Sequence, residues 1–356
     1  MDSVTRTSRD SDVVGALPLE SWPQLEEFVH RVLGDVLPRK DQRSAAVDYV
    51  RGLMAFGRRK TMRAMAHSVG TDPRRFQHLL RTSRWDDQLA RARLAERALS
   101  SRAPEVVVIR TFSTPRAGAR LAGTAPRYAP DLGRDVRCQT AIFAYAVGVS
   151  WASPLSWRLL PDTGGSDRKS VLDAVGALVR ELAVEIERWR FSSVSAVPLL
   201  LEDELPIHHR PDHWPTHSRL HWIAKAATDQ GRILIGPTAV PENVRWSEPG
   251  MGPMSAYFHR VSPTSGENGG GGFLLQVPSS AGSTSAWEFD LPDADTTAVV
   301  GLVKTGAMVH REHTWLRGQL GLDAYEGRSR RGWNRHCTLV ATARRFQTEI
   351  GGAAGF

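Results

Sequence analysis

The sequence predicts an α/β protein with a helical N-terminal part, and three patterns carry this prediction. Residues 106–109 form a β-branched run of the kind found in a buried strand, and a second apolar stretch follows at 138–149. Residues 170–189 have the spacing of a long amphipathic helix between short apolar runs at 157–160 and 195–201. Strand, helix and strand in this order indicate a layered α/β domain.

The first hundred residues show helical spacing instead. Ser21-Trp22-Pro23 is a plausible helix start, Asp41 is expected to cap a second helix, and Gly70 to end a third. Thr71-Asp72-Pro73 then opens a fourth helix. The expected helices cover residues 25–33, 42–54, 60–68, 72–81 and 86–99.

The last part of the chain is less regular. The Pro- and Gly-rich segment from about 211 to 300 suits an insertion of short strands and loops, with helical stretches at 303–320 and 338–350 behind it. The expected organisation is therefore a disordered N-terminus (1–17), a helical, DNA-binding domain (18–102), the first part of an α/β core (103–210), the insertion (211–300) and the rest of the core (301–350).

Composition points to a polyanionic partner. The chain has 356 residues, 41% of them hydrophobic, and a net charge of +8 that comes almost wholly from Arg, whose planar fork suits phosphate. A bland alternative is that the Arg excess reflects codon usage. The only cysteines, Cys138 and Cys337, stand far apart, which argues against a disulfide framework and for a reducing cytoplasm. No run of eighteen apolar residues occurs, so we expect no membrane partner.

Residues 62–81 suggest a DNA-reading helix pair. A short helix, Gly70 and a second helix follow the arrangement of a helix-turn-helix. The side chains on the second helix that could contact phosphates or base edges are Arg74, Arg75, Gln77, His78 and Arg81. A plain helix pair with a solvated basic face would give the same pattern.

Two other patterns were weighed as sites. Five histidines within fourteen residues could bind a transition metal, but Pro215 interrupts a helix there, and solvated loop histidines are the plainer interpretation. These are His208, His209, His213, His217 and His221. Gly269 to Gly272 lacks the Lys-Ser/Thr ending of a phosphate loop and is interpreted as a turn.

Three stretches carry family motifs. The first, from Ile109 to Ala146, holds Gly118, Ala122-Gly123, Arg127-Tyr128, Cys138-Gln139 and Phe143-Ala144-Tyr145-Ala146 in order, and the second is Glu202-Asp203-Glu204. The third, the most specific, is Gly-Leu-Asp-Ala-Tyr-Glu at 321–326, Arg328, and Gly-Trp-Asn-Arg-His-Cys-Thr-Leu at 332–339. In these residues the chain resembles the DDE transposases of bacterial insertion sequences, in particular the seven-zero-one family within the insertion-sequence-four group. The resemblance covers about half the chain and leaves 210–305 unmatched.

The resemblance implies a ribonuclease-H-like core with an N-terminal helical domain and an insertion. It also implies three acidic side chains that hold two divalent cations for phosphoryl chemistry. Here Arg110 and Thr111 stand where the family has its paired first acids, Asp203 keeps the second acid, and His310 stands at the position of the third. Only Asp203 is left as a metal ligand, and Arg110 is expected to pair with it. Glu312 lies two residues beyond His310, a rotation of roughly 200° on a helix, so it should point away.

The leading hypothesis is a transposase-like, DNA-binding pseudoenzyme that no longer cuts or joins strands, with DNA as partner, a homodimer left open and no cofactor. A second hypothesis is an active DDE transposase that uses Asp203, Glu312 and a third acid such as Glu105 or Asp135, with Mg²⁺ or Mn²⁺. A third is recruitment of the scaffold to an unrelated cytoplasmic role, because fold alone does not fix function. Glu326, in the best-matched motif, is interpreted as a polar partner of Arg328 or Arg335.

Overall fold

The computed structural model describes eleven stretches of the chain. They are residues 22–55, 60–118, 120–163, 165–189, 197–204, 221–225, 242–248, 252–260, 273–278, 284–291 and 296–353. The N-terminal segment predicted to be disordered, 1–17, lies outside the described residues.

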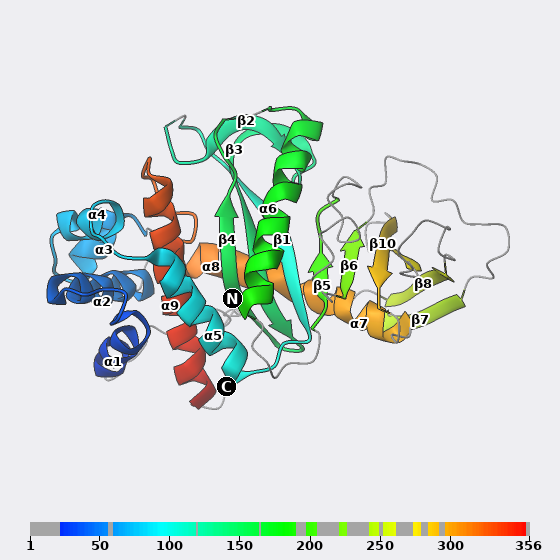
Figure 1. Cartoon of the computed structure of the whole chain (residues 1–356), viewed down its shortest axis with the longest axis horizontal. Coiled ribbons are helices and arrows are strands. Elements are labelled where there is room, and N and C mark those ends of the chain that lie inside the picture. The colour runs from blue at the N-terminus through cyan, green and yellow to red at the C-terminus, as the bar shows by residue number, and fades with distance from the viewer. Residues whose placement is uncertain are drawn as a thin grey trace, which may run out of the picture.

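A mixed sheet forms the centre of the α/β part (Figure 1). Its first strands are β1 (Val106–Pro115), β2 (Thr124–Ala129), β3 (Arg134–Gly148), β4 (Trp151–Leu159), β5 (Leu199–Leu201) and β6 (Trp222–Lys225). β3 is antiparallel to β1 and to β4, whereas β5 is parallel to both β1 and β6. The spatial order β4-β3-β1-β5-β6, antiparallel on one side of β1 and parallel on the other, is consistent with a ribonuclease-H-like core.

The sheet continues into the segment that the sequence predicted as an insertion. β10 (Thr284–Asp290) is antiparallel to β6, and β9 (Phe273–Pro278), β8 (Gly252–Arg260) and β7 (Glu242–Glu248) follow it as a meander. β6 lies inside the predicted range of the insertion, yet its parallel pairing with β5 makes it a strand of the central sheet. The boundary expected at residue 211 therefore does not coincide with the end of the parallel strands.

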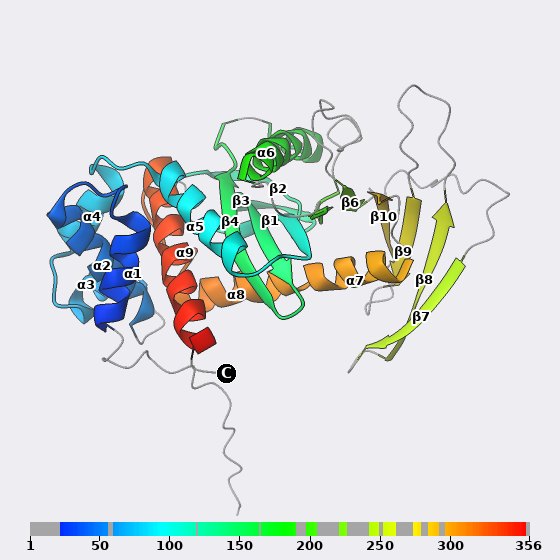
Figure 2. The ribbon, with the colours of Figure 1, turned by 60° about the horizontal axis from the view of Figure 1, so that its bottom comes forward.

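Helices cover both faces of the sheet. α6 (Arg168–Trp189) packs on the face that holds Val107 and Ile109, and α7 (Thr296–Gly306) and α8 (Met308–Leu320) cover the opposite face, as Figure 2 shows. Because successive strand residues point to opposite faces, Arg110 shares the α8 face with Val108 and Thr111 the α6 face with Ile109. Burial on both faces explains the continuous apolar run of β1.

The stretch predicted as one helix over 303–320 is two helices. The amide of Ala307 donates to the carbonyl of Lys304 at 3.0 Å, a tight turn of 3₁₀ type, and α8 begins directly after it. Residue spacing alone did not reveal this break, because both helices keep apolar side chains toward the sheet.

The N-terminal helices follow their local start and stop signals. They are α1 (Trp22–Leu33), α2 (Lys40–Met54), α3 (Met62–Ser68), α4 (Pro73–Arg81) and α5 (Asp87–Ser101). The Asp72 side chain accepts from the amide of Arg74, Asp86 caps α5, and Gly70 has a φ of 68° after α3. The predicted cap by Asp41 is wrong: α2 begins at Lys40, and the amide of Arg39 donates to Gln42 Oε1.

These helices share their core with the end of the chain. α9 (Arg330–Ala353) starts before the predicted residue 338 and packs against α2, α4 and α5. The apolar side chains of α1 to α4, of α9 and of the α8 face of the sheet form one continuous cluster. The N-terminal helices are therefore held on the α/β part through α9.

Candidate functional site

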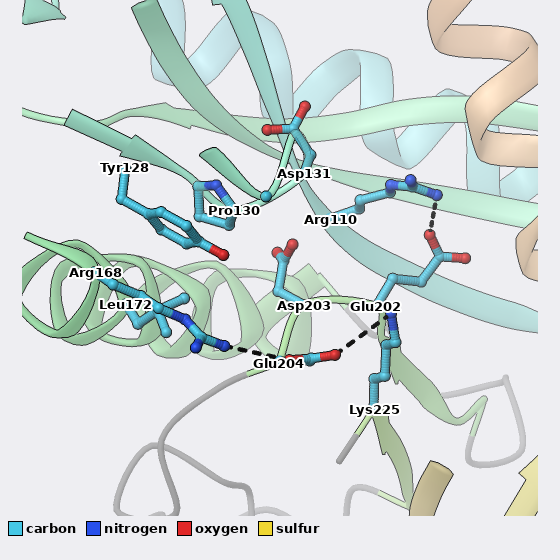
Figure 3. Close-up of a pocket in the computed structure, with 11 residues that line it drawn as sticks. Arg110, Tyr128, Pro130, Asp131, Arg168, Leu172, Glu202, Asp203, Glu204 and Lys225 are labelled. Carbon is cyan, nitrogen blue, oxygen red and sulfur yellow. Dashed lines mark hydrogen bonds and ion pairs between the residues drawn. The ribbon is translucent and has the colours of Figure 1, made fainter. Parts of the chain in front are cut away.

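The candidate site lies where β1 runs on past the end of β5. β5 stops at Leu201, which is in register with Ile109, and the chain leaves the sheet through Glu202, Asp203 and Glu204. Continuing this register sets Arg110 opposite Glu202 and Thr111 opposite Asp203 (Figure 3). The two pairs point to opposite faces, so the backbone alone decides which side chains meet.

Asp203 is buried and bound to the neighbouring strand. Its Oδ2 accepts from the amide of Thr111 at 2.8 Å and from the Thr111 hydroxyl at 2.7 Å, and the residue is 7% exposed. Burial raises the pKa of Asp203 to about 6, while the bond from Thr111 and the charge of Arg110 oppose the rise. Asp203, the one acid that the resemblance retains, is thus a buried acceptor of two hydrogen bonds from Thr111.

The Arg110 side chain lies at the same end of β1, on the opposite face of the sheet from Asp203. Its Nη1 lies 2.5 Å from Glu202 Oε2, and its guanidinium stands over the ring of Phe112. Burial raises the pKa of the Glu202 carboxyl, and the charge of Arg110 counters this. The expected pairing of Arg110 with Asp203 is wrong, because the strand register presents Glu202 on the face to which Arg110 points.

His310 lies near the start of α8 and is exposed. Partial burial lowers the pKa of His310, and the nearby charge of Arg110 lowers it further. The resemblance expects carboxylates at both positions, which here carry an imidazole and a guanidinium.

The sequence missed Asp131, which follows β2. Its Oδ2 accepts from the amide of Ser113 at 2.8 Å, and its charge helps to raise the pKa of Asp203. The amides of Thr111 and Ser113 point to the same side of β1, beyond the end of β5. The first donates to Asp203 and the second to Asp131. The only signal in the sequence was an acid beside Pro130 in a predicted loop, which is too common to nominate.

A hollow of about 260 Å³ opens beside these groups. Figure 3 shows Tyr128 projecting toward Asp203 from one side, and Glu204 lying between Arg168 and Lys225 on the other. Each of these two cations is 3.7 Å from a Glu204 oxygen. Four acids and three cations thus line the cleft, and each of the four carboxylates already has a protein partner.

The alternative acids lie elsewhere. Glu312 is buried and makes a two-pronged pair with Arg344 of α9, at 2.6 and 2.8 Å, so the prediction that it points away is confirmed. Glu105 is at the opposite end of β1, where its amide bonds to Val147, and Asp135 is exposed on β3. Within the described stretches, no three or more His, Cys, Asp or Glu side chains are grouped so that they could hold a metal ion.

The predicted histidine site is largely outside the described residues. This applies to His208, His209, His213 and His217. His221 is described, and its carbonyl accepts from the amide of Leu199 at 2.9 Å, which ties the start of β6 to β5.

The predicted DNA-reading helix presents a coherent face. Arg74, Gln77, His78 and Arg81 are all exposed, and their spacing of three, four and seven residues sets them on one side of α4. Arg75 is turned toward α2, where its Nη1 lies 2.9 Å from Asp48 Oδ2. His78 Nδ1 lies 3.0 Å from the hydroxyl of Ser83. Four of the five predicted side chains therefore share one solvent-facing side.

Residues of the third motif, at 332–339, connect α9 to the N-terminal helices. Arg335, which is fully buried, donates to the carbonyls of Leu80 at 3.1 Å and Trp85 at 2.8 Å. His336 Nε2 meets the carbonyl of Gly321, and its Nδ1 meets the Tyr49 hydroxyl at 2.8 Å. The interpretation of Arg335 as a partner of Glu326 is wrong, since its guanidinium points into the helical core instead.

The comparison with protein families agrees with this architecture. Residues 32–175 match the family model described as DDE superfamily endonuclease. The match runs from α1 into α6 and so includes Arg110 and Asp131, but it ends before Asp203 and His310. It supports a DDE transposase-type family. A search of curated proteins found no match. No helix within the described residues is long and apolar enough to cross a membrane.

Proposed function

We propose that this protein is a transposase-like DNA-binding protein that has lost strand cleavage and strand transfer, within the seven-zero-one type of DDE family. One observation carries the proposal: Arg110, which stands where the resemblance expects the first acid, is paired with Glu202. A guanidinium cannot lose its proton in a protein and cannot ligate a cation. With His310 at the third position, Asp203 is left without the two partners that a pair of metal ions requires.

The residues of the cleft do not fit the divalent cations that a DDE core uses. Asp131 and Asp203 both line the cleft, and each accepts a hydrogen bond from an amide of β1 through one carboxylate oxygen. The positive charge of Arg110 lies next to them, and it repels a cation. No step of strand chemistry is therefore assigned to a metal, and no other cofactor is proposed.

DNA binding is proposed for the exposed face of α4. Its support is the spacing of Arg74, Gln77, His78 and Arg81, the net charge of +8 and the lack of a competing carboxylate bond for Arg74 and Arg81 within the described residues. A homodimer and a cytoplasmic location stay predictions. A role as a regulator of a related element fits a protein that binds DNA and does not cut it.

One assay on a single DNA preparation tests both halves of this proposal. Purified protein should shift duplex DNA, with an affinity that falls steeply as salt rises, and should not nick it in Mg²⁺ or Mn²⁺. The double variant Arg74→Gln/Arg81→Gln should raise Kd roughly tenfold at ~0.1 M salt and lower the salt slope by about 2, since each phosphate contact contributes about 0.9. Arg102→Gln, which removes one exposed positive charge after α5, is the control for net charge.

Two outcomes would refute the proposal. If the protein does not bind DNA at low salt, the proposed DNA binding is refuted. Robust metal-dependent nicking that disappears in Asp203→Ala would refute the proposed loss of strand cleavage and favour an active transposase.

A further inference from the structure

Four exposed arginines gather where α4 ends and α9 begins. Arg81 and Arg84 come from the end of α4 and the loop behind it, Arg328 from the loop before α9, and Arg331 from the first turn of α9. Within the part of the chain that the structure describes, none of the four is paired with a carboxylate. We call these four residues the arginine surface.

Several contacts bring the two segments together. Arg84 and Arg331 line one open hollow of about 620 Å³, together with Asn334 and with the acidic residues Asp86 and Asp87. Arg335 of α9 donates to the carbonyl of Leu80 at 3.1 Å, which holds the residue next to Arg81 against α9. Figures 1 and 2 both show the start of α9 beside the connection from α4 to α5.

The loop before α9 and the first turn of α9 are closely packed against Tyr325. A Cβ added at Gly332 would lie 2.0 Å from the Tyr325 hydroxyl, and one at Gly327 would lie 2.2 Å from it. The loop before α9 is therefore wrapped closely around Tyr325. Arg335 and His336 then fix α9 to α4 and α2. The four guanidinium groups are held at defined positions by a buried joint, so binding would cost little backbone ordering.

The nearby acidic side chains do not neutralise the positive charge of the arginine surface. Asp86 accepts the amides of Gln88 and Leu89 at the start of α5, and an Asp87 oxygen lies 3.9 Å from Arg91 on the buried side. Glu326 is exposed close by, and its charge acts on Arg116. Four arginines against these three acids still leave an excess of positive charge.

We propose that the arginine surface binds backbone phosphates of duplex DNA beside the stretch that α4 contacts, so that the start of α9 is part of the DNA-binding interface. This inference rests on the proposed DNA binding by α4. Arg81 belongs to both faces, which makes the two continuous. Guanidinium groups that lack carboxylate partners suit phosphate oxygens, and such contacts position the duplex without reading its sequence.

The test compares Arg328→Gln/Arg331→Gln with wild type on a long duplex. Kd should rise about tenfold at ~0.1 M salt, and the slope of log K against log salt should fall by about 2. A hydroxyl-radical footprint should lose protection at one end and keep it at the other. Arg102→Gln, which removes one positive charge behind the far end of α5, should change neither.

The outcomes separate this inference from the function on which it rests. If wild type binds and Arg74→Gln/Arg81→Gln weakens binding, but Arg328→Gln/Arg331→Gln keeps the wild-type slope and footprint, the arginine surface is not a DNA contact and the proposed function stands. An equal effect of Arg102→Gln would also overturn the inference, since net charge alone would explain the loss. Failure of wild type to bind at low salt removes the proposed function itself.

Discussion

Replacing Arg335 by Leu is expected to lower the free energy of unfolding by about 3–5 kcal/mol, because it strands buried carbonyl groups. The guanidinium is fully buried, lies 4.8 Å from the Trp85 ring centroid and donates to the carbonyls of Leu80 and Trp85. These acceptors belong to the end of α4 and the loop behind it, where helix carbonyls lack helical partners. Chemical denaturation at neutral pH measures the loss.

Arg331→Leu is the matched control for this substitution. It makes the same change on the same helix, one turn earlier, at an exposed position, so we expect a change within about 0.5 kcal/mol. A loss below about 1 kcal/mol in Arg335→Leu would contradict the assignment of Arg335 as the joint between α9 and α4.

The pair between Glu312 and Arg344 gives the second large effect. Arg344→Met leaves the Glu312 carboxylate buried without its partner, and breaking such a pair costs about 3–5 kcal/mol. Burial already raises the pKa of Glu312, and Arg344 counters it, so removing Arg344 raises this pKa further. The variant should therefore be most destabilised well above that pKa and regain stability as pH falls through it, because the carboxyl then takes up a proton.

The double variant Glu312→Leu/Arg344→Met provides the control. Both charges are gone and similar volume remains, so most of the lost stability should return, with little dependence on pH. If the double variant is no more stable than Arg344→Met alone, the buried charge is not the cause of the loss, and the place of Glu312 on the α9 side of α8 would be in question.

Local chemistry made the N-terminal helices predictable from sequence. Asp72 and Pro73 signal a helix start, Gly70 a helix end, and Asp86 a cap, and each acts within a few residues of its own position. The run at Val106–Ile109 predicted β1 for a similar reason, since burial on both faces requires apolar residues at every position.

The contacts of the cleft depended on strand pairing, which no short pattern encodes. Asp203 was expected at the end of a strand and is found there, but its partner is Thr111 because Leu201 pairs with Ile109. Asp131 reaches the cleft only because β2 and β3 form a hairpin over it. The sequence predicted the residues at the two strand ends but not the register, which alone decides whether Arg110 faces Asp203 or Glu202.

The same reason explains why the best-matched motif was hard to interpret. Arg335 and His336 bind groups more than two hundred residues and fifteen residues away, respectively, and neither partner is visible in the local sequence. Both side chains join α9 to the N-terminal helices, so we interpret the motif as structural.

Binding of Mn²⁺, followed by electron paramagnetic resonance with and without duplex DNA, tests most directly whether the cleft has lost its metals. With Arg110 paired to Glu202 and His310 at the third position, we expect no saturable Mn²⁺ signal that depends on Asp203. Saturable binding of two Mn²⁺ ions per chain, abolished by Asp203→Ala and retained in Arg102→Gln, would contradict the account.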